Sequence, residues 1–274
     1  MTWQLRPGVR LARRDADRLQ LGADPPLAAV LPDLPSVRLL LVELAHGSPL
    51  STLDASTAPA LDALVAAGLV EAADEVARRR EARSGHRLLV EAPDGVLAPL
   101  LGLLGQTGLR ITRDPAEADV TLIWTEGEPR RGVLDEVMRS ATPHLVVREL
   151  LGGTMLGPYV VPGATACLRC VDAHLGERDP RRSLVVEQLA VTPPLRPARP
   201  DQAGRALAVG WAVRDLVTAA DGGRPATWSA TVDLGLLPPR VTPYQRHLHC
   251  GCAWSEELVD TAAARAEGAV RRAG

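Results

Sequence analysis

The sequence predicts an α/β protein in which a small module of strands and helices precedes a doubly wound parallel sheet. Three observations predict this fold class. Short alternating strand patterns and then helical spacing occupy residues 1–72. From His86 onward strands and helices alternate with short turns, the pattern of a parallel sheet covered by helices. The four cysteines stand in two close pairs in this second part, which indicates a structural metal site.

Three expected strands open the first module. Apolar and basic residues alternate over 9–13, the chain turns at 14–17, and residues 18–21 alternate again. After a Gly- and Pro-containing turn, residues 27–31 form the third expected strand. Successive strands joined by short turns pair as an antiparallel sheet.

Helical spacing follows the strands. Ser36 is a suitable N-cap for a helix over 37–45 that His46 and Gly47 close. A short second helix is expected over 49–54, and a third begins at Thr57, with its apolar residues on one face. A small antiparallel sheet with three helices is the winged-helix pattern, and we place this domain at residues 1–72.

Residues 73–85 are charged and lack an apolar stripe, so we expect them to link this domain to a second domain over 86–274. The second domain contains the alternating elements of the predicted parallel sheet. Its expected strands are 88–90, 109–112, 119–124 and 144–148, and its expected helices are 96–106 and 131–140.

Composition narrows the classes of function. The chain has 274 residues and a net charge of -2, which argues against a general nucleic-acid-binding protein. All 31 Lys and Arg residues are arginine, so no lysine exists to form a Schiff base or reach a nucleotide phosphate. No apolar run approaches the roughly 18 residues of a membrane span. Residues 1–11 lack a signal-peptide core, and we expect a cytoplasmic protein that binds no membrane.

The cysteines form a C-x-x-C pair, Cys167 and Cys170, and a C-x-C pair, Cys250 and Cys252. Two pairs of thiolates match a tetrahedral zinc site in which all positions are filled by the protein, so the expected role of the ion is structural. A cytoplasmic location disfavours disulfides. Replacement of one thiolate by His247 or His249 stays open as a variant of the site. The other histidines, His86, His144 and His174, are expected to be isolated.

The segment 159–170, an apolar strand followed by Pro-Gly and Cys-x-x-Cys, resembles the zinc knuckle of the ThiF/MoeB adenylating superfamily. The ending 249–252 resembles one branch of it, the ThiF-like proteins that bind leader peptides in clusters making azole-containing, ribosomally derived peptides of the thiopeptide type. The resemblance extends over about 86–254. The first domain matches that branch in pattern and position only.

The features that an adenylating enzyme needs are missing. The turn after the first strand of the second domain, 92–97, has one glycine and an aspartate that would repel phosphate. Only 113–118 separates the second strand of that domain from its third, where such enzymes carry a long basic segment. We therefore expect a chain that is not an enzyme and does not use ATP.

The resemblance implies a protein that binds the leader of a precursor peptide and delivers it to a YcaO-type cyclodehydratase. The leader would add a strand to a sheet edge, and an arginine cluster would attract its acidic residues. A solvated strand face explains the same arginines equally well. Whether the chain forms a homodimer stays open. The expected peptide-binding residues are Leu27, Ala28, Ala29, Val30 and Leu31 of the third strand, Leu61, Leu64 and Val65 of the third helix, and Arg10, Arg13 and Arg14.

Two other functions compete with this one, beside the simpler alternative of a structural subunit with no peptide affinity of its own. The first is an active ATP-dependent adenylating enzyme. The second is a winged-helix DNA-binding regulator, although the residues over 57–72 are mostly Ala, Leu and Val and form a poor surface for DNA.

Overall fold

The structure is a computed structural model that describes residues 2–50, 53–196 and 201–253. The chain divides into two compact units, Met1–Arg80 and Glu81–Gly274. The division falls inside helix α3 (Ala73–Gly85), which covers the segment predicted as a linker and has no buried residue. None of the helices in the described ranges is long and apolar enough to cross a membrane.

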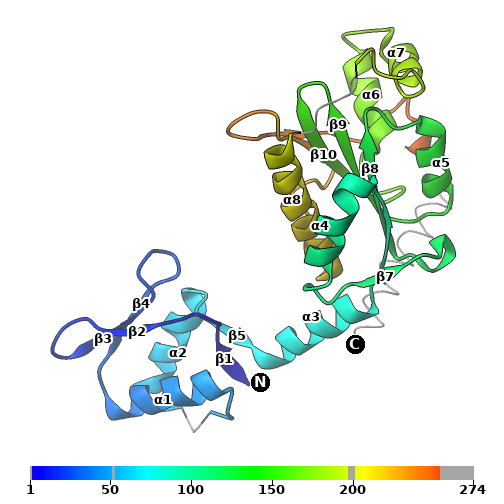
Figure 1. The fold of residues 1–274 in the computed structure, drawn as a ribbon. Coiled ribbons are helices and arrows are strands. Elements are labelled where there is room, and N and C mark those ends of the chain that lie inside the picture. Colours follow the sequence, from blue (N-terminus) through cyan, green and yellow to red (C-terminus); the bar gives the residue numbers. More distant parts are fainter. Residues whose placement is uncertain (1, 51–52, 197–200, 254–274) are drawn as a thin grey trace. The chain divides into compact units, whose positions relative to one another are not determined.

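The first unit contains the expected three-stranded antiparallel sheet, with β3 between β2 and β4 (Figure 1). The side chains of Leu19, Leu21 and Leu31 point from one face of this sheet into a core that Leu44 and Leu64 complete from the helices. The elements are β1 (Trp3–Leu5), β2 (Leu11–Arg13), β3 (Arg18–Leu21), β4 (Ala29–Pro32), α1 (Pro35–His46), α2 (Thr57–Ala66) and β5 (Val70–Ala72).

Three details of the first unit differ from the prediction. The N-cap of α1 is Leu34 with Pro35 in the first turn, so the assignment of Ser36 as the cap is wrong. The hydroxyl of Ser36 instead lies 2.9 Å from that of Ser56. The expected helix over 49–54 is absent from the described residues of that stretch, and residues 51–52 lie outside them. A second small sheet, β1 paired with β5, was not expected.

A seven-stranded sheet forms the centre of the second unit, in the order β12-β11-β10-β9-β8-β6-β7. The strands β7, β6, β8 and β9 are parallel, as predicted. The remaining strands are antiparallel, so the sheet is mixed rather than wholly parallel. The strands are β6 (Arg87–Glu91), β7 (Arg110–Thr112), β8 (Val120–Glu126), β9 (His144–Leu150), β10 (Gly153–Val160), β11 (Ala230–Asp233) and β12 (Arg240–Pro243).

Helices cover both faces of this sheet because successive side chains of its strands alternate between the faces. Leu122 and Trp124 of β8 belong to the core shared with α4 and α8, whereas Ile123 between them belongs to the core shared with α5 and α6. The helices of this unit are α4 (Asp94–Leu104), α5 (Arg131–Arg139), α6 (Leu168–Gly176), α7 (Arg182–Leu189) and α8 (Gln202–Ala220), with short 3-10 turns η1 (Pro115–Glu117) and η2 (Gly251–Ala253).

Candidate functional site

Strand β4 is an edge strand of the first unit's sheet, since within the described residues it pairs only with β3. Its ladder fixes which backbone groups face outward. The N–H of Asp33 donates to the C=O of Asp17 at 2.8 Å, and the register pairs Leu31 with Leu19 and Val30 with Gln20. Because hydrogen-bonded and non-hydrogen-bonded pairs alternate along an antiparallel ladder, the N–H and C=O of Val30 point to the open edge.

The side chains of the predicted groove divide between the surface and the core. Those of Leu27, Val30 and Val65 are 51%, 40% and 40% exposed, and Ala28 is half-buried. The other four predicted apolar residues lie in the core, where they support the strand and the helix: Ala29, Leu31, Leu61 and Leu64.

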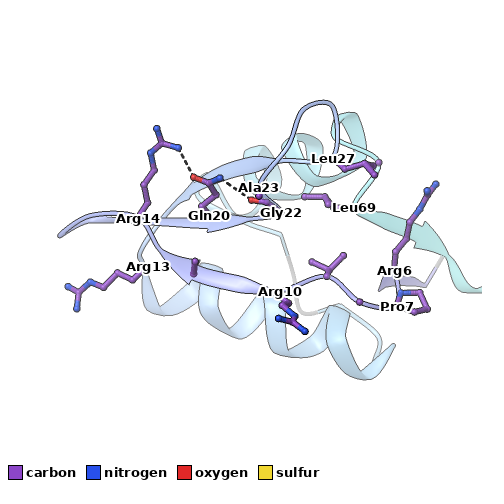
Figure 2. A pocket seen from close by; sticks show the side chains of 14 residues that line it. Arg6, Pro7, Arg10, Arg13, Arg14, Gln20, Gly22, Ala23, Leu27 and Leu69 are labelled. Atoms are coloured by element: carbon purple, nitrogen blue, oxygen red, sulfur yellow. Dashed lines mark hydrogen bonds between the residues drawn. The ribbon is translucent and has the colours of Figure 1, made fainter.

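A hollow of about 760 Å³ in the same unit lies along β2 and the turn that precedes β4, and it gathers Leu27 with the three predicted arginines. No residue of β4 itself lines this hollow. Arg6 and Gln20 also line it, and they were absent from the predicted site although the sequence places Arg6 in the same basic segment. The lining residues, drawn in Figure 2, are Arg6, Pro7, Gly8, Val9, Arg10, Ala12, Arg13, Arg14, Gln20, Gly22, Ala23, Leu27, Gly68 and Leu69.

The arginines of the hollow are exposed and form no salt bridge within 4 Å among the described residues, although Arg13 interacts electrostatically with Asp33. Arg14 donates to the side chain of Gln20 at 2.6 Å, and Arg13 donates to two backbone carbonyls. In Figure 2 the side chains of Arg6, Arg10, Arg13 and Arg14 extend from the backbone in separate directions. Guanidinium groups that point in separate directions can each attract a different carboxylate of an extended chain, whereas a single compact anion cannot lie close to all of them.

Gly22 explains why the hollow has this shape. Its φ is +71°, and a Cβ atom there would lie 1.9 Å from the carbonyl oxygen of Leu27. Only glycine tolerates both conditions. The chain can therefore fold back after β3 and bring Leu27 against Gly68, which follows α2.

The two predicted cysteine pairs meet in the second unit. The Sγ atoms of Cys167 and Cys250 are 3.6 Å apart, those of Cys170 and Cys252 are 3.4 Å apart, and those of Cys167 and Cys170 are 3.8 Å apart. Four thiolates around a zinc ion at about 2.3 Å would be about 3.8 Å from one another. The set therefore fits a tetrahedral metal ion, and the thiols are free rather than oxidised.

The local structure of each pair explains this convergence. Cys167 is the N-cap residue of α6, so Cys170 lies one turn further along the same helix. The N–H of His247 donates to the Sγ of Cys170 at 3.4 Å, which is the kind of contact that stabilises a thiolate. A hydrogen bond from Cys167 lowers the pKa of the Cys250 thiol to about 7.

An ion-pair network among the described residues lies at the carboxyl ends of the parallel strands. This is the edge at which doubly wound sheets bind nucleotides. Arg205 of α8 donates to both carboxylate oxygens of Glu149 at 2.7 Å and to Glu126 at 2.8 Å. A Cβ atom on Gly95, in the first turn of α4, would lie 3.1 Å from Arg205 Nη1. The guanidinium group thus covers the helix start at which a phosphate would bind.

A second ion-pair network is buried behind α5. Arg131 is 1% exposed and donates to Asp172 at 2.7 Å and to Glu128 at 2.8 Å, and Arg148 donates to Glu128 at 3.1 Å. Burial alone would raise the pKa of Glu128, but the charges of Arg148 and Arg131 outweigh burial and hold the pKa below its usual value. These three pairs are almost fully buried and connect α5 to α6 and β9.

The sequence matches no family model and no curated protein. The fold resembles that of solved structures. The heterocyclase TruD has a TM-score of 0.69 and 17% identity over 92% of this chain, which spans only 42% of TruD. The E. coli protein MccB, solved with AMPCPP and selenomethionine MccA, has a TM-score of 0.63 and 10% identity over 93% of this chain and 100% of MccB.

A further structure, the microcin C7 biosynthetic enzyme MccB with N-formylated MccA, has a TM-score of 0.61 at 10% identity, covering 92% of this chain and 100% of that one. At these identities the likeness is one of fold. The mixed α/β architecture of this chain is therefore similar to that of MccB and of part of TruD, across both units.

Proposed function

We propose that this chain captures the leader segment of a precursor peptide and presents it to a YcaO-type cyclodehydratase in the biosynthesis of azole-containing peptides. The observation that carries the proposal is the open edge of β4, where Val30 offers its backbone groups. The basic hollow belongs to the same unit and includes Leu27, in the turn that leads into β4. An extended peptide binds such an edge by adding a strand. TruD is described as a heterocyclase, and MccB was solved with the peptide MccA, which supports a peptide partner for this chain.

The first unit would be the recognition domain, of the winged-helix type found in leader-binding proteins. Its support is the arrangement of β2, β3 and β4 with α2 packed against them. Val65 of α2 is exposed, as is Val30 of β4, so a peptide on this edge would have apolar side chains from both elements near it. Arg10, Arg13 and Arg14 would attract acidic residues of the leader, which chiefly speeds association.

The four cysteines would hold a structural zinc ion. A full set of four thiolates leaves no position for water or substrate. The ion would join residues 83 apart in the chain, Cys167 and Cys250, and so attach the C-terminal segment to the start of α6.

We propose further that the second unit is a docking platform without adenylating activity. Arg205 lies where phosphates would be held, and it is already neutralised by Glu149 and Glu126. A nucleotide would have to displace these ion pairs and face both released carboxylates, together with Asp94 in the first turn of α4. The same position lacks the glycine-rich turn of an ATP site.

The DNA-binding alternative is less compatible with the surface of α2. The residues that this helix exposes are Pro59, Asp62, Val65 and Ala66, none of which is basic. Base recognition in the major groove uses Arg, Lys, Asn or Gln on the exposed face of a helix.

The deciding experiment is fluorescence anisotropy of the full chain with the labelled leader of the short precursor that we expect to be encoded in neighbouring genes. ATP binding is measured in parallel by calorimetry. We expect saturable leader binding, weakened by Arg10→Gln but not by Arg240→Gln, an exposed arginine of β12 in the second unit. Binding of ATP without affinity for the leader would overturn the proposal and favour the adenylating enzyme.

A further inference from the structure

Next to the cysteine cluster, three other side chains that ordinarily bind metals come together. His174 lies near the end of α6, Glu177 caps that helix, and His247 lies three residues before Cys250. The carboxylate of Glu177 is 3.1 Å from Nε2 of His247 and 3.9 Å from Nδ1 of His174. One ligand atom from each residue lies within 4.8 Å of the others. His174 is therefore not isolated, contrary to the sequence-based prediction.

A hydrogen bond from the ring of His174 fixes the tautomer that a metal ligand needs. Its Nε2 lies 2.9 Å from the backbone carbonyl oxygen of Gln245 and can only donate to it. The ring is thereby held in the tautomer that carries its proton on Nε2, which leaves the lone pair of Nδ1 directed toward Glu177. Histidines that bind metals almost always donate their other ring N–H to a carbonyl or carboxylate in this way.

This cluster is separate from the four sulfurs. His247 contacts Cys170 through its backbone N–H, whereas its ring faces Glu177 and packs edge-on against the ring of His174, with 4.7 Å between centroids. The ring of His247 is therefore not positioned to replace a thiolate in the cysteine site. The segment around His247 contributes to two different groups of ligands.

We propose that His174, Glu177 and His247 form a second metal site, for a divalent first-row ion such as Zn²⁺. Two imidazoles and one carboxylate are a ligand set that zinc accepts, with water in the fourth position. The ligands are Nδ1 of His174, a carboxylate oxygen of Glu177 and Nε2 of His247. Tetrahedral zinc at about 2.0–2.1 Å needs ligand atoms about 3.3 Å apart. Glu177 is 65% exposed and free to make the small adjustment required.

Binding requires one proton to move. His247 now donates from Nε2 to Glu177, and its Nδ1 accepts from the N–H of His249 at 3.2 Å. When the ion takes the place of the Nε2 proton, that proton passes to Nδ1 and the contact from His249 opens. The imidazole stays neutral, and the carboxylate of Glu177 changes partner from the N–H to the ion.

The test is a count of zinc per chain by elemental analysis after equilibrium dialysis of the full protein against buffered zinc. We expect two zinc ions in the wild type and one in His174→Gln, Glu177→Gln and His247→Gln. His249→Gln is the matched control, because the ring of His249 packs against that of His247, with 5.4 Å between centroids, but is not one of the three ligands; this variant should keep two. We expect the affinity of the second ion to fall by about 100-fold or more in the three variants, since loss of even an outer partner costs roughly 10–100-fold.

Cobalt titration separates the two sites and verifies that each variant is folded. The first equivalent should show intense thiolate-to-cobalt charge transfer from the cysteine site, and the second should add only weak ligand-field absorption. A variant that retains the thiolate signal and loses the second step supports the proposal. Saturation of the wild type at one ion, or a second ion that persists in all three variants, would overturn it.

Discussion

The open edge of β4 can be tested with a single backbone change. In Val30→Pro the N–H that points away from β3 is removed, while the hydrogen bonds of Leu31 and Ala29 to β3 are kept. Proline is tolerated on an edge strand when its missing N–H faces outward. The variant should therefore fold with a thermal unfolding temperature close to that of the wild type.

The expected loss of leader binding follows from the hydrogen bond that disappears. A hydrogen bond between the Val30 N–H and a peptide carbonyl contributes about 0.5–1.5 kcal/mol net, and leaving that carbonyl unpaired costs about 1–3 kcal/mol more. The sum of roughly 1.5–4.5 kcal/mol corresponds to a Kd that rises about 10- to 2000-fold. Fluorescence anisotropy with a labelled leader measures this change directly.

Val30→Ala is the matched control, because it removes the exposed side chain and keeps the N–H. The Kd of this control should rise by less than that of Val30→Pro. If a folded Val30→Pro variant binds the leader within about twofold of the wild type, the peptide does not pair with this edge, and the strand-addition reasoning is refuted.

Three further predictions concern stability. Cys252→Ser should lower the metal content and the unfolding temperature together, because four sulfurs 3.4–3.8 Å apart would lose one ligand; an unchanged metal content measured by elemental analysis would contradict the site. Arg131→Met should cost about 3–5 kcal/mol in denaturant unfolding, since it leaves buried carboxylates without their partner, whereas Arg169→Met at an exposed pair should cost about 0–1 kcal/mol. Burial lowers the pKa of His144 to about 4, below its value of 6.5 in the unfolded chain. Above pH 6.5 this residue is neutral in both states, and the free energy of unfolding should fall by about 3 kcal/mol as the pH drops from 6.5 to 4. His144→Gln should flatten this part of the pH dependence of unfolding, and an unchanged slope would contradict it.

Elements with local signals were predictable from the sequence. The alternating pattern of 18–21 and the parallel strands from 88 onward correspond to β3 and to β6, β7, β8 and β9. The cysteine pairs converge as their spacing indicated. Each of these features could be predicted from one short segment, a strand from its alternating residues and a metal site from two cysteines within one turn.

Pairings between distant residues were not predictable. The strand Trp3–Leu5 is too short for a recognisable period, and its partner strand, Val70–Ala72, lies more than sixty residues further along the chain. Arg131 and Asp172 are 41 residues apart, and Arg205 and Glu126 are 79 apart. In an arginine-rich chain no local feature distinguishes these arginines from exposed ones, so their burial follows only from the tertiary fold.

The short length of β4 limits what backbone pairing can contribute to leader binding. Within this strand the outward groups are the N–H and C=O of Val30, because Pro32 has no N–H and its carbonyl oxygen already accepts from Leu34 at 3.0 Å. Two hydrogen bonds stabilise a complex by about 2 kcal/mol net, whereas even micromolar affinity needs about 8 kcal/mol. The larger part of the binding free energy must then come from side chains. The surface available for it near this edge is the exposed Leu27, Val30 and Val65, so the segment of a leader that binds here should carry apolar residues at alternate positions. The arginines of the hollow lie toward β2, so the acidic residues that they attract should lie outside the segment that pairs with β4.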